Sequence, residues 1–179
     1  MRKRRDEGFT LIEVIVVAGI IAILAGVLIP MILKEIDESR TTRASADIRS
    51  IASAILVFKK DTAQWPAMDG TCVASLTLLT GGGNVPTGLG ANGWDNTSST
   101  TIDSHLMLDG TGCYNNWKGP YLPSTSADPW GNQYVINADS FGAAAGVPVW
   151  IISAGPNGNL DTNANATALD NDDIGARIK

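Results

Sequence analysis

Near the start of the chain stands Gly8-Phe9-Thr10-Leu11-Ile12-Glu13, and an uncharged run from Val14 to Leu33 follows it. At about 1.5 Å per residue this run forms a helix of about 30 Å, the thickness of a bilayer's hydrocarbon core. Four basic residues precede it and the charges behind it are mixed, so the positive-inside rule places the N-terminus in the cytoplasm. The sequence therefore predicts a single-pass membrane anchor, with most of the chain outside the cytoplasm.

The position of the small residues predicts how this anchor is processed. A secretory signal peptide needs a small-residue cleavage site behind its apolar run, and Pro30 to Lys34 offers none. The small residue next to the basic leader is Gly8, in front of the run. A cut after Gly8 would remove residues 1–8 as a leader and leave residues 9–33 as a transmembrane and polymerisation helix.

Glu13 is a carboxylate at the edge of this apolar segment. An acidic side chain within a membrane costs about 2.5 to 3.5 kcal/mol on insertion scales and is usually functional. We expect Glu13 to find a cationic partner during assembly. The alternative is that it lies close enough to the interface to snorkel into water.

The rest of the chain, residues 34–179, predicts one globular domain that includes the second half of the helix. The helix should run from about Thr10 to Lys60. Two β-rich runs, Gln133–Asn137 and Val147–Ile152, predict an antiparallel hairpin. The expected class is α+β, with a long helix packed on a small antiparallel sheet. Apolar residues at helical spacing in the second half of the helix form the expected packing face: Ala44, Ile48, Ile51, Ala52 and Ile55.

The segment 67–116 between helix and hairpin is rich in Gly, Thr, Ser and Asn. We expect a long loop there with one short helix at Leu76–Leu79. Cys72 and Cys113 lie near its ends and are the two cysteines of the chain. An even count outside the cytoplasm favours a Cys72–Cys113 disulfide, with two buried free thiols as the alternative.

Composition argues against several functions. Without the leader's four basic and two acidic residues, nine basic and sixteen acidic residues remain, a net charge of −7 that disfavours nucleic-acid binding. Phosphate-binding loops and nucleophile motifs are absent from the sequence, so no enzyme activity is predicted. His105 is the one histidine; it cannot form a zinc site with cysteines so far apart, and we expect it in a surface loop.

The C-terminal segment is dense in hard oxygen donors, which suit calcium. The spacing is not that of an EF-hand, and a solvated acidic loop would have a similar composition. The candidate metal ligands are Asn157, Asp161, Asp170, Asp172 and Asp173.

Several blocks of sequence resemble a known family. The leader motif, Gly8 to Glu13, is similar to that of type IV pilins and type II secretion pseudopilins. Four ordered blocks resemble the major, G-type pseudopilin of type II secretion systems, and the insertion 67–116 departs from it. The blocks are Trp117-Lys118-Gly119-Pro120-Tyr121-Leu122, Asp128-Pro129-Trp130-Gly131-Asn132-Gln133-Tyr134, Ser153-Ala154-Gly155-Pro156-Asn157-Gly158 and Asp172-Asp173-Ile174-Gly175.

The resemblance implies a type IV pilin-like fold and a role as a structural subunit of a periplasmic filament. It implies cleavage between Gly8 and Phe9 by a prepilin peptidase, methylation of Phe9, and pairing of Glu13 with the N-terminal amine of a neighbouring subunit. It also implies a structural calcium ion in the C-terminal loop.

The implied partners are further copies of the chain, minor pseudopilins and an inner-membrane assembly platform. The implied location is the bacterial inner membrane, with a periplasmic domain that joins a filament after assembly. The alternatives are a surface type IV pilin for adhesion or motility and a monomeric, membrane-anchored periplasmic binding domain.

Overall fold

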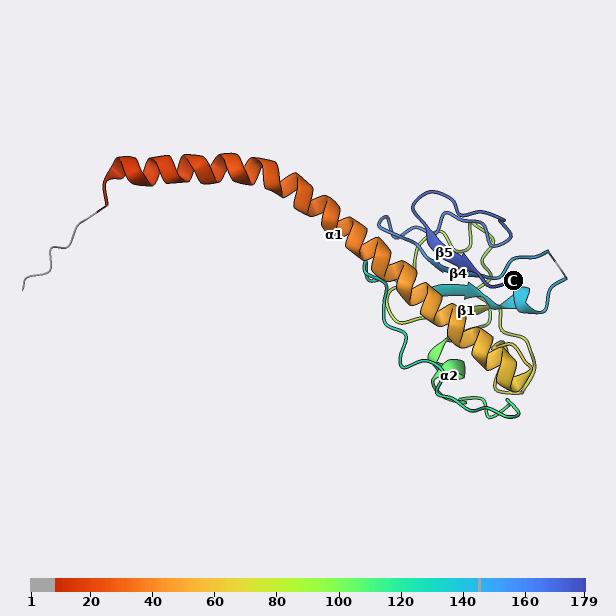
Figure 1. The fold of residues 1–179 in the computed structure, drawn as a ribbon. Coiled ribbons are helices and arrows are strands. Elements are labelled where there is room, and N and C mark those ends of the chain that lie inside the picture. The colour runs from red at the N-terminus through yellow and green to blue at the C-terminus, as the bar shows by residue number, and fades with distance from the viewer. Residues whose placement is uncertain (1–8, 145) are drawn as a thin grey trace, which may run out of the picture. The chain divides into compact units, whose positions relative to one another are not determined.

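The computed structural model describes residues 9–144 and 146–179, so the predicted leader 1–8 lies outside the described residues. The chain divides into two compact units, one ending at Ser39 and the other spanning Arg40–Lys179. A single helix, α1 (Leu11–Thr62), runs through both units (Figure 1). It ends within two residues of the predicted boundary and continues through Pro30.

The part of α1 that belongs to the second unit packs on the domain through one face. Its buried side chains recur at helical spacing, as the apolar pattern predicted. Lys59 and Lys60 lie in the last turn, where positive charge is favourable because the helix dipole is negative there. The buried residues are Ala44, Ile48, Ile51, Ala54, Ile55, Phe58 and Thr62.

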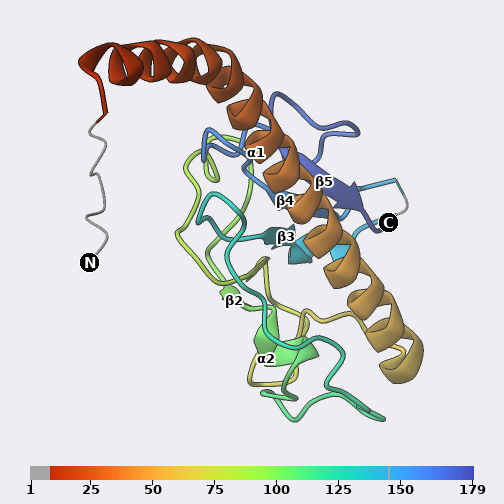
Figure 2. The same cartoon turned by 60° about the vertical axis from the view of Figure 1, so that its left-hand side comes forward.

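A five-stranded sheet with the order β2-β1-β3-β4-β5 forms the centre of the domain (Figure 2). Its pairs are antiparallel except β1–β2, which is parallel, so the sheet is mixed at that edge. The predicted hairpin is the β3–β4 pair, in which both strands begin later than expected, and a 3₁₀ turn, η1 (Ala138–Phe141), follows β3 directly. The strands are β1 (Leu78–Thr80), β2 (Ser99–Thr101), β3 (Val135–Asn137), β4 (Trp150–Ser153) and β5 (Ile174–Arg177).

Each face of the sheet has its own apolar core. On one face Leu79, Ile136 and Ile151 align across neighbouring strands and belong to the same buried cluster as Ile55 and Phe58 of α1. On the other face Val135 and Ile152 pair directly and pack in a second cluster with Leu78, Trp94 and Leu160. Because both faces are covered, successive residues of β3 and β4 are apolar rather than alternating with polar ones.

The insertion 67–116 supplies part of the second core. Trp94 is buried, and its indole N–H donates to the carbonyl of Thr162 at 2.8 Å. Asn92 donates to the carbonyl of Leu160 at 2.6 Å. The insertion thus lies against the C-terminal loop and shields the sheet face that α1 does not cover.

The expected helix at Leu76–Leu79 is wrong. Leu78 and Leu79 belong instead to strand β1, which pairs with both β2 and β3. The insertion's short helix is instead α2 (Asp103–Leu106), which begins directly after β2. Thr77 and Thr80 flank Leu78 and Leu79, and threonine favours extended backbone because its β-branch restricts χ1.

Candidate functional site

The N-terminal end of α1 is a capping box. Thr10 precedes the first helical residue and Glu13 is the third residue of the helix. The backbone N–H and the hydroxyl of Thr10 donate to the Glu13 carboxylate at 2.9 and 2.6 Å, and the Glu13 N–H donates to the Thr10 hydroxyl at 3.4 Å. This reciprocal pairing satisfies donors that a helix start leaves open. The carboxylate therefore has partners within its own chain before any neighbour arrives.

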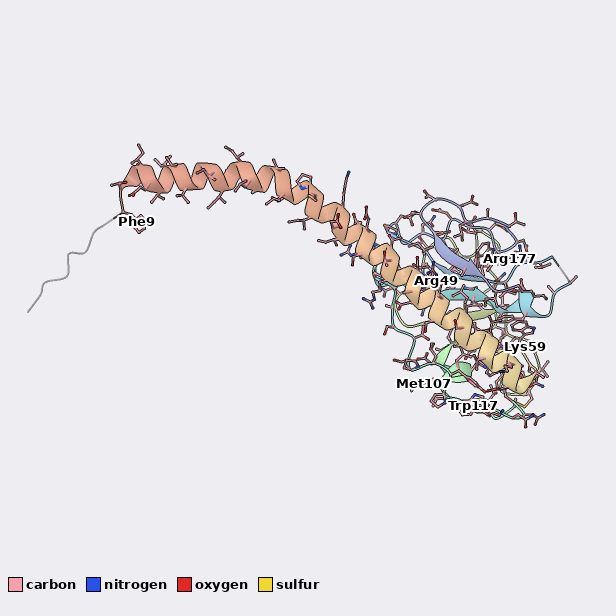
Figure 3. All side chains as sticks on the ribbon, in the orientation of Figure 1. Phe9, Arg49, Lys59, Met107, Trp117 and Arg177 are labelled. Carbon is pink, nitrogen blue, oxygen red and sulfur yellow. A yellow bond between two sulfur atoms is a disulfide. The ribbon has the colours of Figure 1, made fainter. Side chains whose placement is uncertain are left out.

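Within the first unit, the run from Val14 to Leu33 is apolar around its whole circumference. Phe9 is 88% exposed, and the large apolar side chains that follow it up to Leu33 are exposed as well (Figure 3). Among the described residues α1 is the one helix long and apolar enough to cross a membrane. The domain thus carries a helix suited to membrane anchoring. Gly8, the predicted cleavage residue, lies outside the described part of the chain.

A disulfide joins Cys72 to Cys113, as predicted, across a sequence separation of 41. Asp69 shapes the turn that presents Cys72, because its carboxylate accepts hydrogen bonds from Thr71, Val73 and Ser75. These hydrogen bonds, the one from Ser75 first, hold the pKa of Asp69 well below its usual range. The bridge closes the base of the insertion.

His105 is not in a surface loop, as expected from the sequence, but buried in α2. Its Nδ1 lies 2.7 Å from the hydroxyl of Tyr114, which also accepts the N–H of Met68 at 3.3 Å. Tyr114 packs edge-on against Phe58 at the end of α1, with ring centroids 4.7 Å apart. Isoleucine and leucine at positions 102 and 106 were the signal for a buried helical turn here, and sequence reasoning missed it.

Within the described residues the other ring nitrogen of His105, Nε2, is buried without a hydrogen-bond partner. Burial lowers the pKa of His105 to about 4, because an imidazolium cannot be solvated there. Burial likewise raises the pKa of Tyr114 to about 12. His105 is therefore a neutral structural group at neutral pH.

This burial predicts acid sensitivity. The unfolded chain binds a proton at His105 near pH 6.5, whereas the folded chain binds it only near pH 4. The contribution of the buried, neutral ring to the free energy of unfolding is therefore fully present above about pH 6.5 and is lost as the pH falls towards 4. The loss should amount to about 3 kcal/mol at most. Urea unfolding of a soluble fragment from Lys34, at pH 4.5 and 7.5, measures it. His105→Gln should show a smaller difference between the two pH values, and an equal difference would contradict the assignment.

The predicted acidic loop brings three of its five candidate residues together. The side-chain amide of Asn157 donates to Asp161 at 3.0 Å and to Asp172 at 2.6 Å, and its backbone N–H donates to Asp172 at 3.0 Å. Asn171 and Asn159 also donate to Asp161. The hydrogen bonds from Asn171 and then Asn157 lower the pKa of Asp161, which keeps it ionised.

Asp173 and Asp170 lie differently. One oxygen of Asp173 accepts the backbone N–H groups of Asp161 and Thr162, at 3.0 and 2.6 Å. Its other oxygen is buried without a partner among the described residues, and burial raises its pKa. Asp170 contacts Thr162 through its backbone N–H, which donates to the Thr162 hydroxyl. In the described part of the chain no three carboxylate, imidazole or thiolate groups converge as a metal cluster.

The loop can nevertheless offer oxygens to a cation. Two carboxylates point at a single amide group, and calcium accepts amide and carbonyl oxygens beside carboxylates. The amide nitrogen of Asn157 stands between the two negative groups, where a cation would be favourable. The donor set therefore fits calcium in chemical type.

Comparison with known proteins agrees with this geometry. The family described as "Prokaryotic N-terminal methylation motif" matches residues 3–29, and "Type II secretion system (T2SS), protein G" matches residues 98–172. The chain is 28% identical to type II secretion system core protein G of Pseudomonas aeruginosa, over 96% of this chain and 100% of that protein. Core protein G of Escherichia coli K12 is 29% identical over 91% and 90% of the two chains. That of Aeromonas hydrophila is 28% identical over 98% and 94%. No solved structure gives a significant match.

The apolar helix with its methylation motif, continued into a domain that packs on a small sheet, gives the chain a type IV pilin-like fold. Within that class the chain resembles the G-type pseudopilin of type II secretion, and the prediction from the ordered sequence blocks is confirmed.

Proposed function

We propose that this chain is a structural subunit of a periplasmic pseudopilus for type II protein secretion. The observation that carries the proposal is similarity to core protein G over more than nine tenths of the chain in three bacteria, together with the N-terminal methylation motif. The family is structural rather than enzymatic. Before assembly the chain is anchored in the inner membrane with its domain in the periplasm, and it then polymerises with copies of itself.

The proposed assembly uses both units. The apolar run from Val14 to Leu33 of the first unit leaves the lipid and packs among the same runs of other copies. Its exposed apolar side chains, covered by lipid before assembly, are then covered by protein. The proposed partners are a prepilin peptidase, an inner-membrane assembly platform and minor pseudopilins. Nucleic acid is not among them, since the mature chain is acidic.

Processing tests the proposal directly. The purified subunit should begin at an N-methylated Phe9, because Gly8 precedes the apolar run and no small-residue site follows it. Intact-mass and peptide mass spectrometry check this. Gly8→Val should leave the leader attached while membrane insertion continues. Gly19→Val is the matched control, because a Cβ at Gly19 meets no atom within 4 Å. A subunit that begins at Met1 or beyond Leu33 would rule out the pilin-type pathway.

We also propose that calcium binds the acidic loop, held by oxygens of Asp161, Asp172 and Asn157. Asp170 and Asp173 are the other candidates in the loop. Calcium would supply positive charge between carboxylates that otherwise repel one another. The amide of Asn157 can turn its oxygen inward by a half rotation about its terminal bond.

Calcium should therefore raise the melting temperature of the fragment that begins at Lys34. Binding to the folded state alone contributes about 2.7 kcal/mol at a hundredfold excess over Kd. Magnesium should substitute poorly, because it demands tight octahedral geometry and retains its waters. Asp161→Ala should abolish the response, whereas Asp95→Ala, outside the loop, should keep it. Identical melting curves in chelator and in calcium would reduce the loop to a solvated acidic segment.

A further inference from the structure

A groove opens beside the C-terminal end of α1. It has a volume of about 270 Å³, and its lining includes Trp65, Ala67, Met68 and Phe141. Trp65 stacks on Phe141 with ring centroids 4.8 Å apart and an interplanar angle of 13°. This volume lies at the lower end for small-molecule sites, which bury ligands in about 300 to 1,000 Å³. The groove therefore suits one or two side chains of another protein.

Two lysine ammonium groups lie beside this groove. The ammonium of Lys59 lies 5.0 Å from the Trp65 ring centroid and donates to the carbonyl of Ala63 at 2.7 Å. Lys179 donates to two carbonyls, of Phe141 at 3.2 Å and of Ala143 at 2.8 Å. Within residues 9–144 and 146–179 neither ammonium forms an ion pair, so both charges remain available to a partner.

The groove also contains an open acceptor. The side-chain oxygen of Gln64, one of the lining residues, is buried and lacks a hydrogen-bond donor in the described part of the chain. The acids close to the groove in sequence already have partners: Asp61 pairs with Lys118 at 3.8 Å, Asp69 accepts hydrogen bonds from Thr71 and Ser75, and Asp139 accepts the backbone N–H of Ser140 at 2.7 Å. The groove thus combines an apolar floor with a basic rim, which suit an apolar side chain with an acidic neighbour, while the open acceptor of Gln64 suits a backbone N–H of the same partner.

The chain carries such a segment on the turn after α2. Leu108 is 56% exposed, Met107 beside it is also exposed, and Asp109 follows. Hydrogen bonds hold the turn: the N–H groups of Met107 and Leu108 both donate to the carbonyl of Asp103 at 3.0 Å. A rigid apolar side chain on a surface costs little ordering entropy when a partner covers it. Figure 3 shows Met107 and Lys59 on opposite sides of the α1 ribbon, near its C-terminal end.

We infer that Leu108 and Asp109 of one copy dock into the Trp65–Phe141 groove of the neighbouring copy, with Asp109 facing Lys59. The inference rests on the proposed filament, since a groove and a turn on different surfaces form a heterologous contact that repeats from subunit to subunit. Without the leader the chain has a net charge of −7, so its copies repel one another overall. A local contact between basic rim and acidic turn opposes that repulsion and selects one register.

Site-specific photo-crosslinking in the full-length chain, assembled in cells with its secretion apparatus, tests the contact. A benzophenone amino acid at position 108 should crosslink two copies, with the attachment mapped by mass spectrometry to Gln64–Met68 or Phe141–Gly142. Val85, which is 64% exposed, is the control position and should give different attachment sites. Filaments crosslinked elsewhere from position 108 would overturn the contact and leave the pseudopilus intact. A wild-type chain that forms no filament would overturn the proposed function itself.

A charge exchange tests the pair. Lys59→Glu and Asp109→Lys should each lower the yield of the mapped crosslink about two- to fivefold, and the two together should restore it. Restoration excludes a folding defect of Lys59→Glu as the cause of the loss. Lys60→Glu, one residue along the helix, is the matched control and should change the yield less than twofold, that is, by less than about 0.4 kcal/mol. Equal losses at positions 59 and 60, or no restoration, would overturn the pair.

Discussion

Glu13→Val should insert into the membrane as well as the wild-type chain but assemble at least about tenfold fewer filaments. The valine removes an insertion cost of about 2.5 to 3.5 kcal/mol and also removes the carboxylate that the N-terminus of a neighbour is proposed to pair with. An interaction of only about 1.4 kcal/mol per subunit already changes an assembly constant tenfold. Membrane fractionation and filament counts by electron microscopy measure the two effects separately.

The capping box requires a second variant, because Glu13→Val also removes acceptors for Thr10. Thr10→Val deletes the capping hydroxyl, at a cost of about 1 kcal/mol, and leaves the carboxylate in place. We expect this variant to assemble close to normally. If Thr10→Val lost as many filaments as Glu13→Val, helix capping rather than pairing between subunits would be the function of Glu13.

Replacing both cysteines with serine should lower the free energy of unfolding of the domain by about 4 kcal/mol. The bridge between Cys72 and Cys113 closes a loop across a separation of 41 residues, and the loss of entropy in the unfolded chain grows with loop length. Urea unfolding of the fragment from Lys34 gives the value. Reducing agent should destabilise the wild-type fragment by a similar amount and leave the double variant unchanged. A difference below about 1 kcal/mol would show that the insertion holds itself closed without the bridge.

The elements that depend on residues close together in the sequence could be predicted from the sequence. The anchor, the extent of α1 and the β3–β4 pair follow from hydrophobic periodicity and charge. A turn before β3 is local as well: the side chain of Asp128 accepts the backbone N–H groups of Trp130 and Asn132 at 3.0 and 2.8 Å. The capping box has a local sequence signal too, Thr10 followed three residues later by Glu13.

The insertion could not be predicted in the same way. Leu78 and Leu79 pack on opposite faces of the sheet, in different cores, and only the tertiary fold decides which residue meets which. His105 lies between the apolar residues Ile102 and Leu106 in the sequence, but only the tertiary fold brings Tyr114, nine residues later, to its ring as a hydrogen-bond partner. In the C-terminal loop the composition indicated a cluster, but sequence could not separate Asp161 and Asp172, which face Asn157, from Asp170.

The second core has a consequence for the timing of folding. Its contacts join residues far apart in the chain, such as Trp94 with Thr162 and Asn92 with Leu160, and the edge strand β5 ends two residues before Lys179. Non-local pairings of this kind form slowly, because the chain loses the entropy of loop closure before the stabilising contacts can form. Neither the sheet nor its second core can close until the last stretch of polypeptide has been synthesised. The domain should therefore stay unfolded while the chain is threaded across the membrane, and should fold only after its C-terminal segment has crossed.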